Sequence, residues 1–374
     1  MSKRSFIITS IVAALLLAVL WKLPRSSQES NPLPLTSEES NSSLLTITPC
    51  DHYWQADIRD PWKQGRTLHR YILVDRKDSA QVKDLPDGTV VYVPIERSVV
   101  FTTAHCQLLC WLGAQDAITG VCDKKYIHIP IVQQTAVDCG DGMLPSIERI
   151  VELQPQALLV SPFENSGGFG PLEKIGIPII ETADYMETSS LGRAEWMRFY
   201  GLLYGRQRQA DSLYHVVDST YHALCRQAAA MPQGRSVLTE RKTGSTWYVP
   251  GGQSTIGTML ADAHAAYAFA ADNHSGSLPL SVEEVLDKAG QSDLWLIKNS
   301  TGKSFTRNDL LAEYHGYKML KAFRKGDVYV CNTSERPYFE EVSFRPDYLL
   351  RELILLSHPE CLQNDTLRYY ECME

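Results

Sequence analysis

The sequence predicts an α/β fold of two lobes, each a mostly parallel sheet flanked by helices, joined by one long rigid helix. Short apolar runs alternate with helical patterns over residues 96–190, and the same alternation returns over residues 232–374. Such alternation is typical of a parallel sheet covered on both faces. Between the lobes, residues 191–231 repeat an apolar residue every three or four positions without an internal proline until Pro232. This periodicity predicts a single connecting helix of roughly 55 Å.

The N-terminus resembles an export signal. Lys3 and Arg4 precede an apolar run, Phe6 to Trp21, that would cover about 24 Å as a helix, slightly less than a bilayer requires. No small-residue cleavage pattern follows it, and no cysteine follows that could carry a lipid. Residues 1–23 are therefore interpreted as a signal peptide or an uncleaved membrane anchor. Residues 24–43, rich in Ser, Pro and Glu, are expected to form a flexible linker.

A β-rich extension is expected between this linker and the first lobe, over residues 44–95. Two runs of strand-forming residues, RTLHRYILVD and GTVVYVP, flank the turn-like segment KDLPDG. That pattern predicts a hairpin or a small sheet.

Each lobe can be divided into strands and helices. The first lobe has expected strands at 98–101, 117–121, 157–161 and 177–181, and helices at 105–112, 146–153 and 172–175. The second lobe has strand or helix signals in SVLTE, TGSTWYVPGG, a helix from Ser254, SVEEVLDKA, DLWLIK, GDVYV and a helix after Pro346. Ligands of open α/β sheets bind beyond the carboxyl ends of the strands, so a cleft between the lobes is the expected site.

Composition excludes one class of partner. The chain has 374 residues, of which 44% are hydrophobic and 21% charged, with a net charge of -8 and no basic cluster. A nucleic-acid partner requires a concentrated positive face, so we exclude it. Nine cysteines leave at least one thiol outside intramolecular bridges, and their pairing cannot be deduced from sequence. Cys361 and Cys372 are the pair expected first, and the absence of C-x-x-C argues against a zinc knuckle or a thioredoxin-type site.

Several segments, in order, resemble one family. They are RSVVFTTAHCQLLCWLGAQDAITGV, LPSIERIVELQPQALLVSP, IGIPII, STIGTMLADA, LSVEEVLDKAGQSDLWLI, FRKGDVYV and FRPDYLLRELILLSHPE. Over about Arg97 to Cys361 the chain resembles the iron-complex and vitamin B12 periplasmic binding proteins of ABC transporters. The stretch TTAH, followed later in the chain by TWYVPGG, resembles the sequences of the family branch found in Bacteroidetes-type bacteria. Gln156 stands where the family usually has aspartate.

The resemblance implies a class III periplasmic binding protein that is monomeric, is not an enzyme and has no cofactor. It would capture an iron chelate, haem or cobalamin in the periplasm and dock on an inner-membrane ABC permease. It could be tethered by an uncleaved N-terminus. The family's docking residues correspond to Glu148 and Glu283. Each also opens a predicted helix, where a carboxylate gains from the helix dipole alone.

The first group of candidate ligand-binding residues begins the helix of the first lobe. Thr102 and Thr103 are hydrogen-bond donors to a ligand, N-caps, or both. His105 could line the cleft, bind a metal centre, or hydrogen-bond to its own loop. A nucleophilic pair with Cys106 is disfavoured because adjacent helical residues point about 100° apart. Cys106 and Cys110, one turn apart, favour buried packing over a soft-metal site.

The remaining candidates follow other strands. In the first lobe they are Tyr126, Glu164, Asn165, Ser166 and Tyr185. In the second lobe they are Arg241, Lys242, Trp247, Tyr248, Arg336 and Tyr338. Aromatic and cationic groups there would suit a large conjugated ligand through stacking and cation–π contact. The alternative is that the tryptophan plugs the lobe interface.

Two other classes of function make different demands on the sequence. An enzyme would require a catalytic constellation, and the sequence contains no H-E-x-x-H, G-x-S-x-G, P-loop or G-x-G-x-x-G pattern, so no catalytic residue is assigned. A receptor for bare zinc or manganese would need converging histidines and carboxylates. The ten histidines are scattered and only His105 is well placed, so no metal site is predicted.

Overall fold

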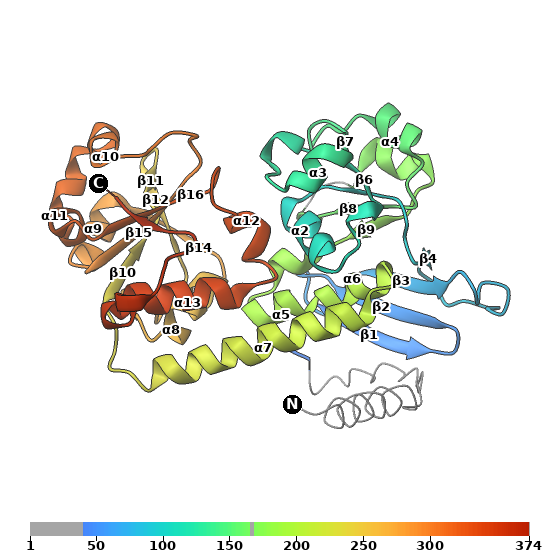
Figure 1. The fold of residues 1–374 in the computed structure, drawn as a ribbon, viewed down its shortest axis with the longest axis horizontal. Coiled ribbons are helices and arrows are strands. Elements are labelled where there is room, and N and C mark those ends of the chain that lie inside the picture. The colour runs from blue at the N-terminus through green and yellow to red at the C-terminus, as the bar shows by residue number, and fades with distance from the viewer. Residues whose placement is uncertain (1–39, 165–167, 374) are drawn as a thin grey trace, which may run out of the picture. The chain divides into compact units, whose positions relative to one another are not determined.

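The computed structural model describes residues 40–164 and 168–373. The proposed signal or anchor and all but the end of the linker lie outside these residues. Within them, the fold class predicted from sequence is confirmed, because two five-stranded sheets are flanked by helices and connected through a long helix (Figure 1). A four-stranded and a three-stranded sheet complete the described strands.

The four-stranded sheet precedes the first lobe. It contains β1 (Leu45–Cys50), β2 (Tyr53–Arg59), β3 (Thr67–Asp75) and β4 (Thr89–Val93), in that order across the sheet. The first three strands are antiparallel and β4 pairs parallel to β3. Buried Tyr71 joins this sheet to the first lobe, because its hydroxyl donates to Ile179 O at 3.1 Å and accepts from Glu181 N at 2.7 Å.

The first lobe is a parallel sheet of order β7-β6-β5-β8-β9. Its strands are β5 (Ser98–Val100), β6 (Ile118–Val121), β7 (Val137–Asp138), β8 (Ala157–Val160) and β9 (Ile179–Glu181). Its helices are α2 (Thr103–Trp111), α3 (Pro130–Thr135) and α4 (Ile147–Leu153), with short 3-10 turns at Gln115–Ala117, Lys124–Tyr126, Gly170–Ile175 and Ala183–Met186. Neighbouring residues along β5 and β8 enter different apolar clusters, Val99 and Leu158 one, Val100 and Leu159 the other. Both sheet faces are therefore covered.

The second lobe has the sheet order β13-β10-β15-β16-β17, in which only β17 is antiparallel. Its strands are β10 (Ser236–Thr239), β13 (Ala266–Tyr267), β15 (Leu294–Asn299), β16 (Val328–Asn332) and β17 (Glu371–Cys372). A separate antiparallel sheet contains β11 (Lys242–Thr243), β12 (Thr246–Pro250) and β14 (Ser277–Ser281). The helices are α8 (Thr255–Asp262), α9 (Val282–Ala289), α10 (Arg307–Glu313), α11 (Lys321–Lys325), α12 (Tyr338–Glu341) and α13 (Pro346–Ser357), with 3-10 turns at His315–Met319 and Pro359–Asn364.

The start of the connecting helix needs correction. Residues 190–203 form two short helices, α5 (Ser190–Glu195) and α6 (Met197–Leu203), and only α7 (Gln207–Ala229) is long. Its 23 residues cover about 35 Å. Gly205, at φ +63°, ends α6 in a left-handed conformation that a helix cannot continue through. The periodicity was misleading because α5 and α6 are buried on most sides, which extends the apolar pattern.

The long helix still contacts both lobes. Its buried positions recur at helical spacing at Ala210, Tyr214, Val217 and Tyr221. It packs on α6 before the turn and on α13 and α8 of the second lobe (Figure 1). A Cβ at Gly201 would lie 2.6 Å from Ala210 Cβ, so glycine is required for the close packing of α6 on α7.

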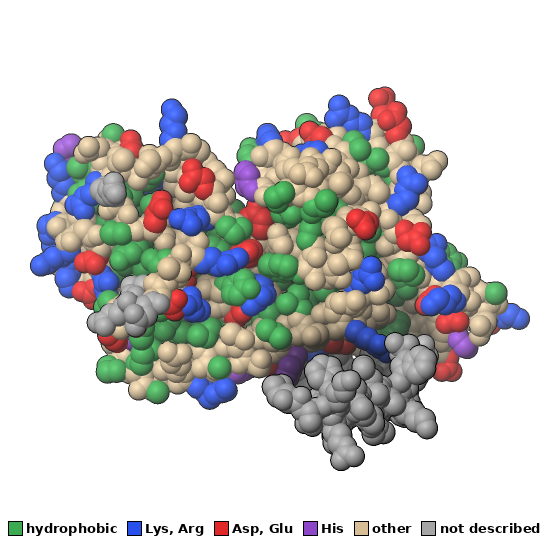
Figure 2. Space-filling model, in the orientation of Figure 1, with side chains coloured by type: hydrophobic (Ala, Val, Ile, Leu, Met, Phe, Trp, Pro, Cys, Tyr) green, Lys and Arg blue, Asp and Glu red, His purple; other side chains and the backbone are tan. Residues whose placement is uncertain are grey.

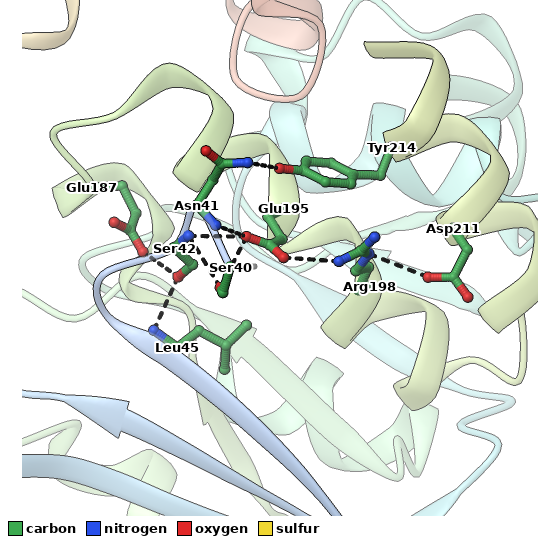
Figure 3. Close-up of polar contacts among 9 residues, drawn as sticks. All are labelled: Ser40, Asn41, Ser42, Leu45, Glu187, Glu195, Arg198, Asp211 and Tyr214. Carbon is green, nitrogen blue, oxygen red and sulfur yellow. Dashed lines mark hydrogen bonds and ion pairs between the residues drawn. The ribbon is translucent and has the colours of Figure 1, made fainter. Parts of the chain in front are cut away.

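A strap of residues 40–44 lies against α5 and α7 (Figure 3). Buried Glu187 accepts hydrogen bonds from Ser42 Oγ at 2.5 Å, from Ser43 N and Oγ at 3.0 and 2.7 Å, and from Leu44 N at 3.0 Å. Buried Glu195 accepts from Ser40 Oγ, Asn41 N and Ser42 N at 2.7 to 3.0 Å. The strap thus supplies most of the hydrogen bonds to two buried carboxylates, and Trp196 Nε1 and Arg198 supply the others at 3.0 and 2.8 Å. These bonds fix where the chain enters the folded body.

Candidate functional site

A cavity of about 420 Å³ lies beyond the carboxyl ends of β5, β6 and β8, where the sequence predicts a ligand site. It is mostly apolar. Its lining residues are Phe101, Thr102, Asp123, Gly142, Met143, Pro145, Val160, Ser161, Phe163, Gly168, Phe169, Gly170, Pro171 and Leu172. All of these residues belong to the first lobe. The volume of the cavity is within the range of small-molecule sites.

The loop 140–145 forms one wall of this cavity. Asp123, at φ +51°, directs its backbone N–H to Gly140 O at 2.7 Å and accepts from Gly142 N on its carboxylate at 3.0 Å. A Cβ at Gly142 would lie 2.8 Å from Asp123 Oδ2, so the loop approaches the carboxylate only because this residue is glycine. The loop exposes two large apolar side chains, Met143 at 71% and Leu144 at 83%. Exposed apolar groups at a cavity mouth are typical of a surface that a ligand covers.

His105 does not face the cavity. It is buried, with Nε2 2.9 Å from Asp184 Oδ1 and Nδ1 2.7 Å from Thr102 Oγ1. Arg193 Nε donates to the other Asp184 oxygen at 3.1 Å. Burial favours a raised pKa for the Asp184 carboxyl, but attraction from and hydrogen bonding to His105 and then Arg193 outweigh it and hold the pKa below its usual value. His105 is therefore a hydrogen-bond partner of a buried carboxylate. Of the three roles expected from sequence, this is nearest to the hydrogen bond with its own loop, which it also makes through Thr102.

Thr102 has both of its expected roles. It is the N-cap of α2, accepting from His105 N at 3.3 Å, and it lines the cavity. Thr103 instead contacts the second lobe, because its hydroxyl donates to Glu340 Oε1 of α12 at 3.2 Å. The Phe344 ring centroid lies 5.9 Å from that of His105. The lobes therefore meet beside the cavity, and Figure 2 shows the surface hollowed between them.

Trp247 is not a cleft residue, which corrects its expected position. It is fully buried, its ring centroid is 5.9 Å from Trp295 and 5.7 Å from Tyr317, and its Nε1 donates to Thr239 O at 3.1 Å. It fills the interior of the second lobe. The neighbouring Tyr248, on the opposite face of β12, is 48% exposed.

The other cationic candidates are engaged within their own lobe. Arg241 pairs with Glu313 at 2.9 Å and its guanidinium lies 4.8 Å from the Phe305 ring centroid. Lys242 donates to Gly244 O at 2.7 Å. Arg336 pairs with Glu371 at 3.2 Å. None of these three lines the first-lobe cavity.

Three other first-lobe candidates, Tyr126, Glu164 and Tyr185, also lie outside the cavity lining. Tyr126 and Glu164 are exposed, and Tyr185 is partly exposed with its hydroxyl donating to Pro162 O at 2.5 Å. Asn165 and Ser166 lie outside the described residues. The sequence reasoning missed Asp123 and the apolar wall that includes Phe163 and Phe169. The available signal was the glycine-containing loops after β7 and β8.

The carboxyl edge of the second-lobe sheet is polar and internally paired. Lys298 forms an ion pair with Glu240, and its Nζ lies 5.4 Å from the ring centroid of Tyr338. Burial disfavours the charged amine, but attraction to Tyr338 and Glu240 outweighs this and raises the pKa of Lys298 above its usual value. Glu240 has φ +58°, a conformation held by its surroundings.

Glu148 and Glu283 are both exposed, in the first turns of α4 and α9 respectively. Both are therefore accessible to a partner. Within residues 40–164 and 168–373, no group of three or more His, Cys, Asp or Glu side chains is arranged to hold a metal ion. Over the same described residues, no helix has the length and apolarity needed to cross a bilayer.

Two α/β lobes, a connecting helix and a cavity beside the lobe contact define a two-lobed solute-binding protein. Residues 99–334 match the family described as periplasmic binding protein. The chain belongs to that family, and its members are binding proteins that serve ABC transporters.

Two curated relatives are lipoproteins of Methanocaldococcus jannaschii. An uncharacterised one is 22% identical over 334 residues, covering 83% of this chain and 78% of the relative. A second is 22% identical and covers 83% of each chain.

Solved structures share the fold. A periplasmic haem-binding protein from Pseudomonas aeruginosa matches with TM-score 0.61 and 16% identity, covering 75% of this chain and 98% of that one. An ABC-type Fe3+-hydroxamate transport protein from Saccharomonospora viridis matches with TM-score 0.55 and 19% identity, covering 70% and 93%. A molybdate-binding protein from Haemophilus influenzae matches with TM-score 0.56 and 17% identity, covering 73% and 89%.

Proposed function

We propose that this protein captures an iron chelate, haem or cobalamin between its lobes and delivers it to an ABC importer. The observation that carries this proposal is the apolar cavity at the carboxyl edge of the first-lobe sheet, beside the contact between the lobes. Aromatic walls at Phe101, Phe163 and Phe169 and the exposed Met143 suit a large ligand with an apolar face. The haem and hydroxamate proteins of the same fold support the choice of ligand class.

The location we propose is outside the cytoplasm. The charged and apolar N-terminal segment would direct export, and it would either be removed or remain as a membrane anchor. The lipoprotein relatives support attachment to a membrane.

The ligand is tested by direct titration. The purified protein is titrated with haemin, cyanocobalamin and a ferric hydroxamate, and its absorption spectrum after isolation from the native host shows what co-purifies. Phe163→Ala should weaken binding of the accepted ligand about tenfold or more, because a large apolar contact is removed. Tyr92→Ala, which removes a similarly exposed aromatic from β4, is the matched control. Binding of none of the three ligands, or equal loss in both variants, would contradict the proposal.

Docking is tested separately from capture. Glu148 and Glu283 are proposed to contact the permease, so Glu148→Ala with Glu283→Ala should abolish uptake while leaving ligand affinity unchanged. Glu152 and Glu284 lie on the same two helices and provide the control double variant. Normal uptake in the Glu148/Glu283 variant would remove the docking assignment.

A further inference from the structure

Two cysteines lie opposite each other at the edge of the first-lobe sheet. Cys122 directly follows β6 and Cys139 directly follows β7. The parallel register pairs Val121 with Asp138, so the next opposed pair is Cys122 and Cys139. Both are buried, at 1% and 0% exposure, and both belong to the same apolar cluster on one face of the sheet.

The backbone geometry suits a covalent link between them. Neighbouring strands lie about 4.8 Å apart, within the range of about 4.4 to 6.8 Å that disulfides span between Cα atoms. Hydrogen bonds fix the register on both sides of the pair, from Cys139 N to Val121 O at 2.8 Å and from Asp123 N to Gly140 O at 2.7 Å.

Gly120 shows that the Cys139 thiol lies on the face of the sheet that Cys122 shares. A Cβ at Gly120 would be 2.8 Å from Cys139 Sγ, so the missing side chain provides the space that this thiol fills. Residues two apart on a strand point to the same face, which places the Cys122 side chain on that face too. In the structure both thiols are free, and the Cys139 thiol donates to Val137 O at 3.8 Å. Formation of the bond therefore requires the Cys139 side chain to rotate away from Gly120 and from this carbonyl.

We propose that Cys122 and Cys139 form a disulfide in the exported protein, which joins the ends of β6 and β7 beneath the cavity wall. This rests on the proposed location outside the cytoplasm, where disulfides persist. A thiolate of the pair attacks an oxidised thiol–disulfide exchange protein and forms a mixed disulfide, releasing one donor thiol. The second cysteine then attacks the mixed disulfide and releases the other donor sulfur. Two electrons and two thiol protons thus pass from the pair to the donor.

Burial affects when this reaction occurs. Burial, followed by the charge of Asp138, raises the pKa of the Cys139 thiol to about 11, and burial together with neighbouring charges raises that of Cys122. Few thiolates exist in the folded state near neutral pH, so the bond forms during folding and is afterwards protected from reductants.

The link would stabilise the ligand cavity. Cys122 precedes Asp123, and Cys139 precedes the loop 140–145 that contributes Gly142, Met143 and Pro145 to the cavity wall. Tying the two strand ends holds both parts of this wall in one register. The bond closes a loop of about 18 residues, and its reduction should lower the thermal midpoint of unfolding by about 5 °C.

The bond is tested on the full chain, exported by its own N-terminus and purified with thiols blocked. The protein is unfolded, treated with N-ethylmaleimide without reduction, digested and analysed by mass spectrometry. We expect one linked product that contains the Cys122 and Cys139 peptides, and its loss after reduction. Cys331, which is buried but has no opposed cysteine, should be alkylated in both samples. Alkylation of both Cys122 and Cys139 before reduction, or linkage of either to another cysteine, would overturn the proposal.

A second measurement avoids dependence on a variant that fails to fold. Reduced and oxidised wild-type protein are compared by thermal unfolding, and Cys122→Ser with Cys139→Ser should remove the difference. Equal midpoints in the wild type would contradict the stabilising role. Free thiols in a protein that captures its ligand would defeat this inference alone, whereas a linked pair in a protein without ligand would defeat the proposed function alone.

Discussion

The two lobes differ in the chemical character of the surface at the carboxyl ends of their parallel strands. In the first lobe, β5, β6 and β8 end at a cavity with exposed Met143 and Leu144. In the second lobe, β10 and β15 end at the Lys298–Glu240 ion pair, and the nearby Trp247 is fully buried. One edge is apolar and open, and the other is polar and paired with itself. The first lobe is therefore the side that we expect to supply most of the ligand contact.

The difference between the lobes originates in the loops at the strand ends. Glycine-containing loops come after β7 and β8, and glycine permits backbone to approach closely where a ligand or a carboxylate must lie. After β10, by contrast, Glu240 is fixed by Lys298 and its carbonyl accepts from Trp295 Nε1 at 2.6 Å. A residue tied by its side chain and its backbone is not free to rearrange around a ligand.

The largest effect is expected where the two lobes differ most, at Trp247. Trp247→Ala should reduce the free energy of unfolding by about 3 to 5 kcal/mol, because it opens a cavity among Trp295, Tyr317 and their neighbours. Ligand affinity of the folded protein should not change. Denaturant unfolding and ligand titration measure the two quantities. Tyr248→Ala, on the exposed face of the same strand, should cost less than about 0.5 kcal/mol. If Trp247→Ala weakened ligand binding and left the free energy of unfolding unchanged, Trp247 would have to contact the ligand.

This residue also marks the limit of prediction from sequence. Alternation in TWYVP shows that Trp247 and Val249 share one face of a strand and that Tyr248 lies on the other. It does not show which face is buried, because that depends on Trp295 and Tyr317, which are far away in the chain. For this reason the prediction that Trp247 lies in the cleft was wrong.

Other parts of the fold were predictable from local signals. The lobes and their parallel sheets follow from periodicity, and the structure agrees. The helix expected over 105–112 begins two residues earlier, at Thr103, and Thr102 is its N-cap. The break at Gly205 was missed because α5 and α6 are buried on most sides and mimic one amphipathic helix. The burial of His105 was missed because Asp184 and Arg193 reach it only after the chain folds.

The next prediction tests whether the Lys298–Glu240 ion pair, at the carboxyl edge of the second-lobe sheet, stabilises the fold. Lys298→Met should lower stability by about 2 kcal/mol, because Glu240 loses its charged partner in a half-buried position. Lys288→Met removes an exposed pair with Glu284 one helical turn away, and because solvent screens that pair it should change stability far less. Urea midpoints of the two variants give the comparison. Equal costs would mean that the pair at the sheet edge is no more important than a surface pair.

The cavity wall offers the converse test, in which ligand affinity changes more than stability. Gly142→Ala would place a Cβ 2.8 Å from Asp123 Oδ2, so the loop 140–145 must shift. We expect a several-fold loss of ligand affinity and a stability change of about 1 kcal/mol. Gly302→Ala in the second lobe, where a Cβ would meet no atom within 4 Å, should change neither quantity. An unchanged affinity for Gly142→Ala would show that this wall does not contact the ligand.

The smallest expected effect is a pH dependence within the second lobe. Burial tends to raise the pKa of the Asp293 carboxyl, but hydrogen bonds from Lys321 and Ser236 outweigh this and lower it to about 2. Because the folded pKa lies below the unfolded value, this group stabilises the fold above about pH 4, and the contribution is lost as pH falls from about 4 toward 2. Asp293→Asn should therefore make the urea midpoint fall less steeply between pH 5 and pH 3 than in the wild type. Asp287→Asn, an exposed neighbour on α9, serves as the control, and equal slopes in all three proteins would show that Asp293 does not stabilise the second lobe through its charge.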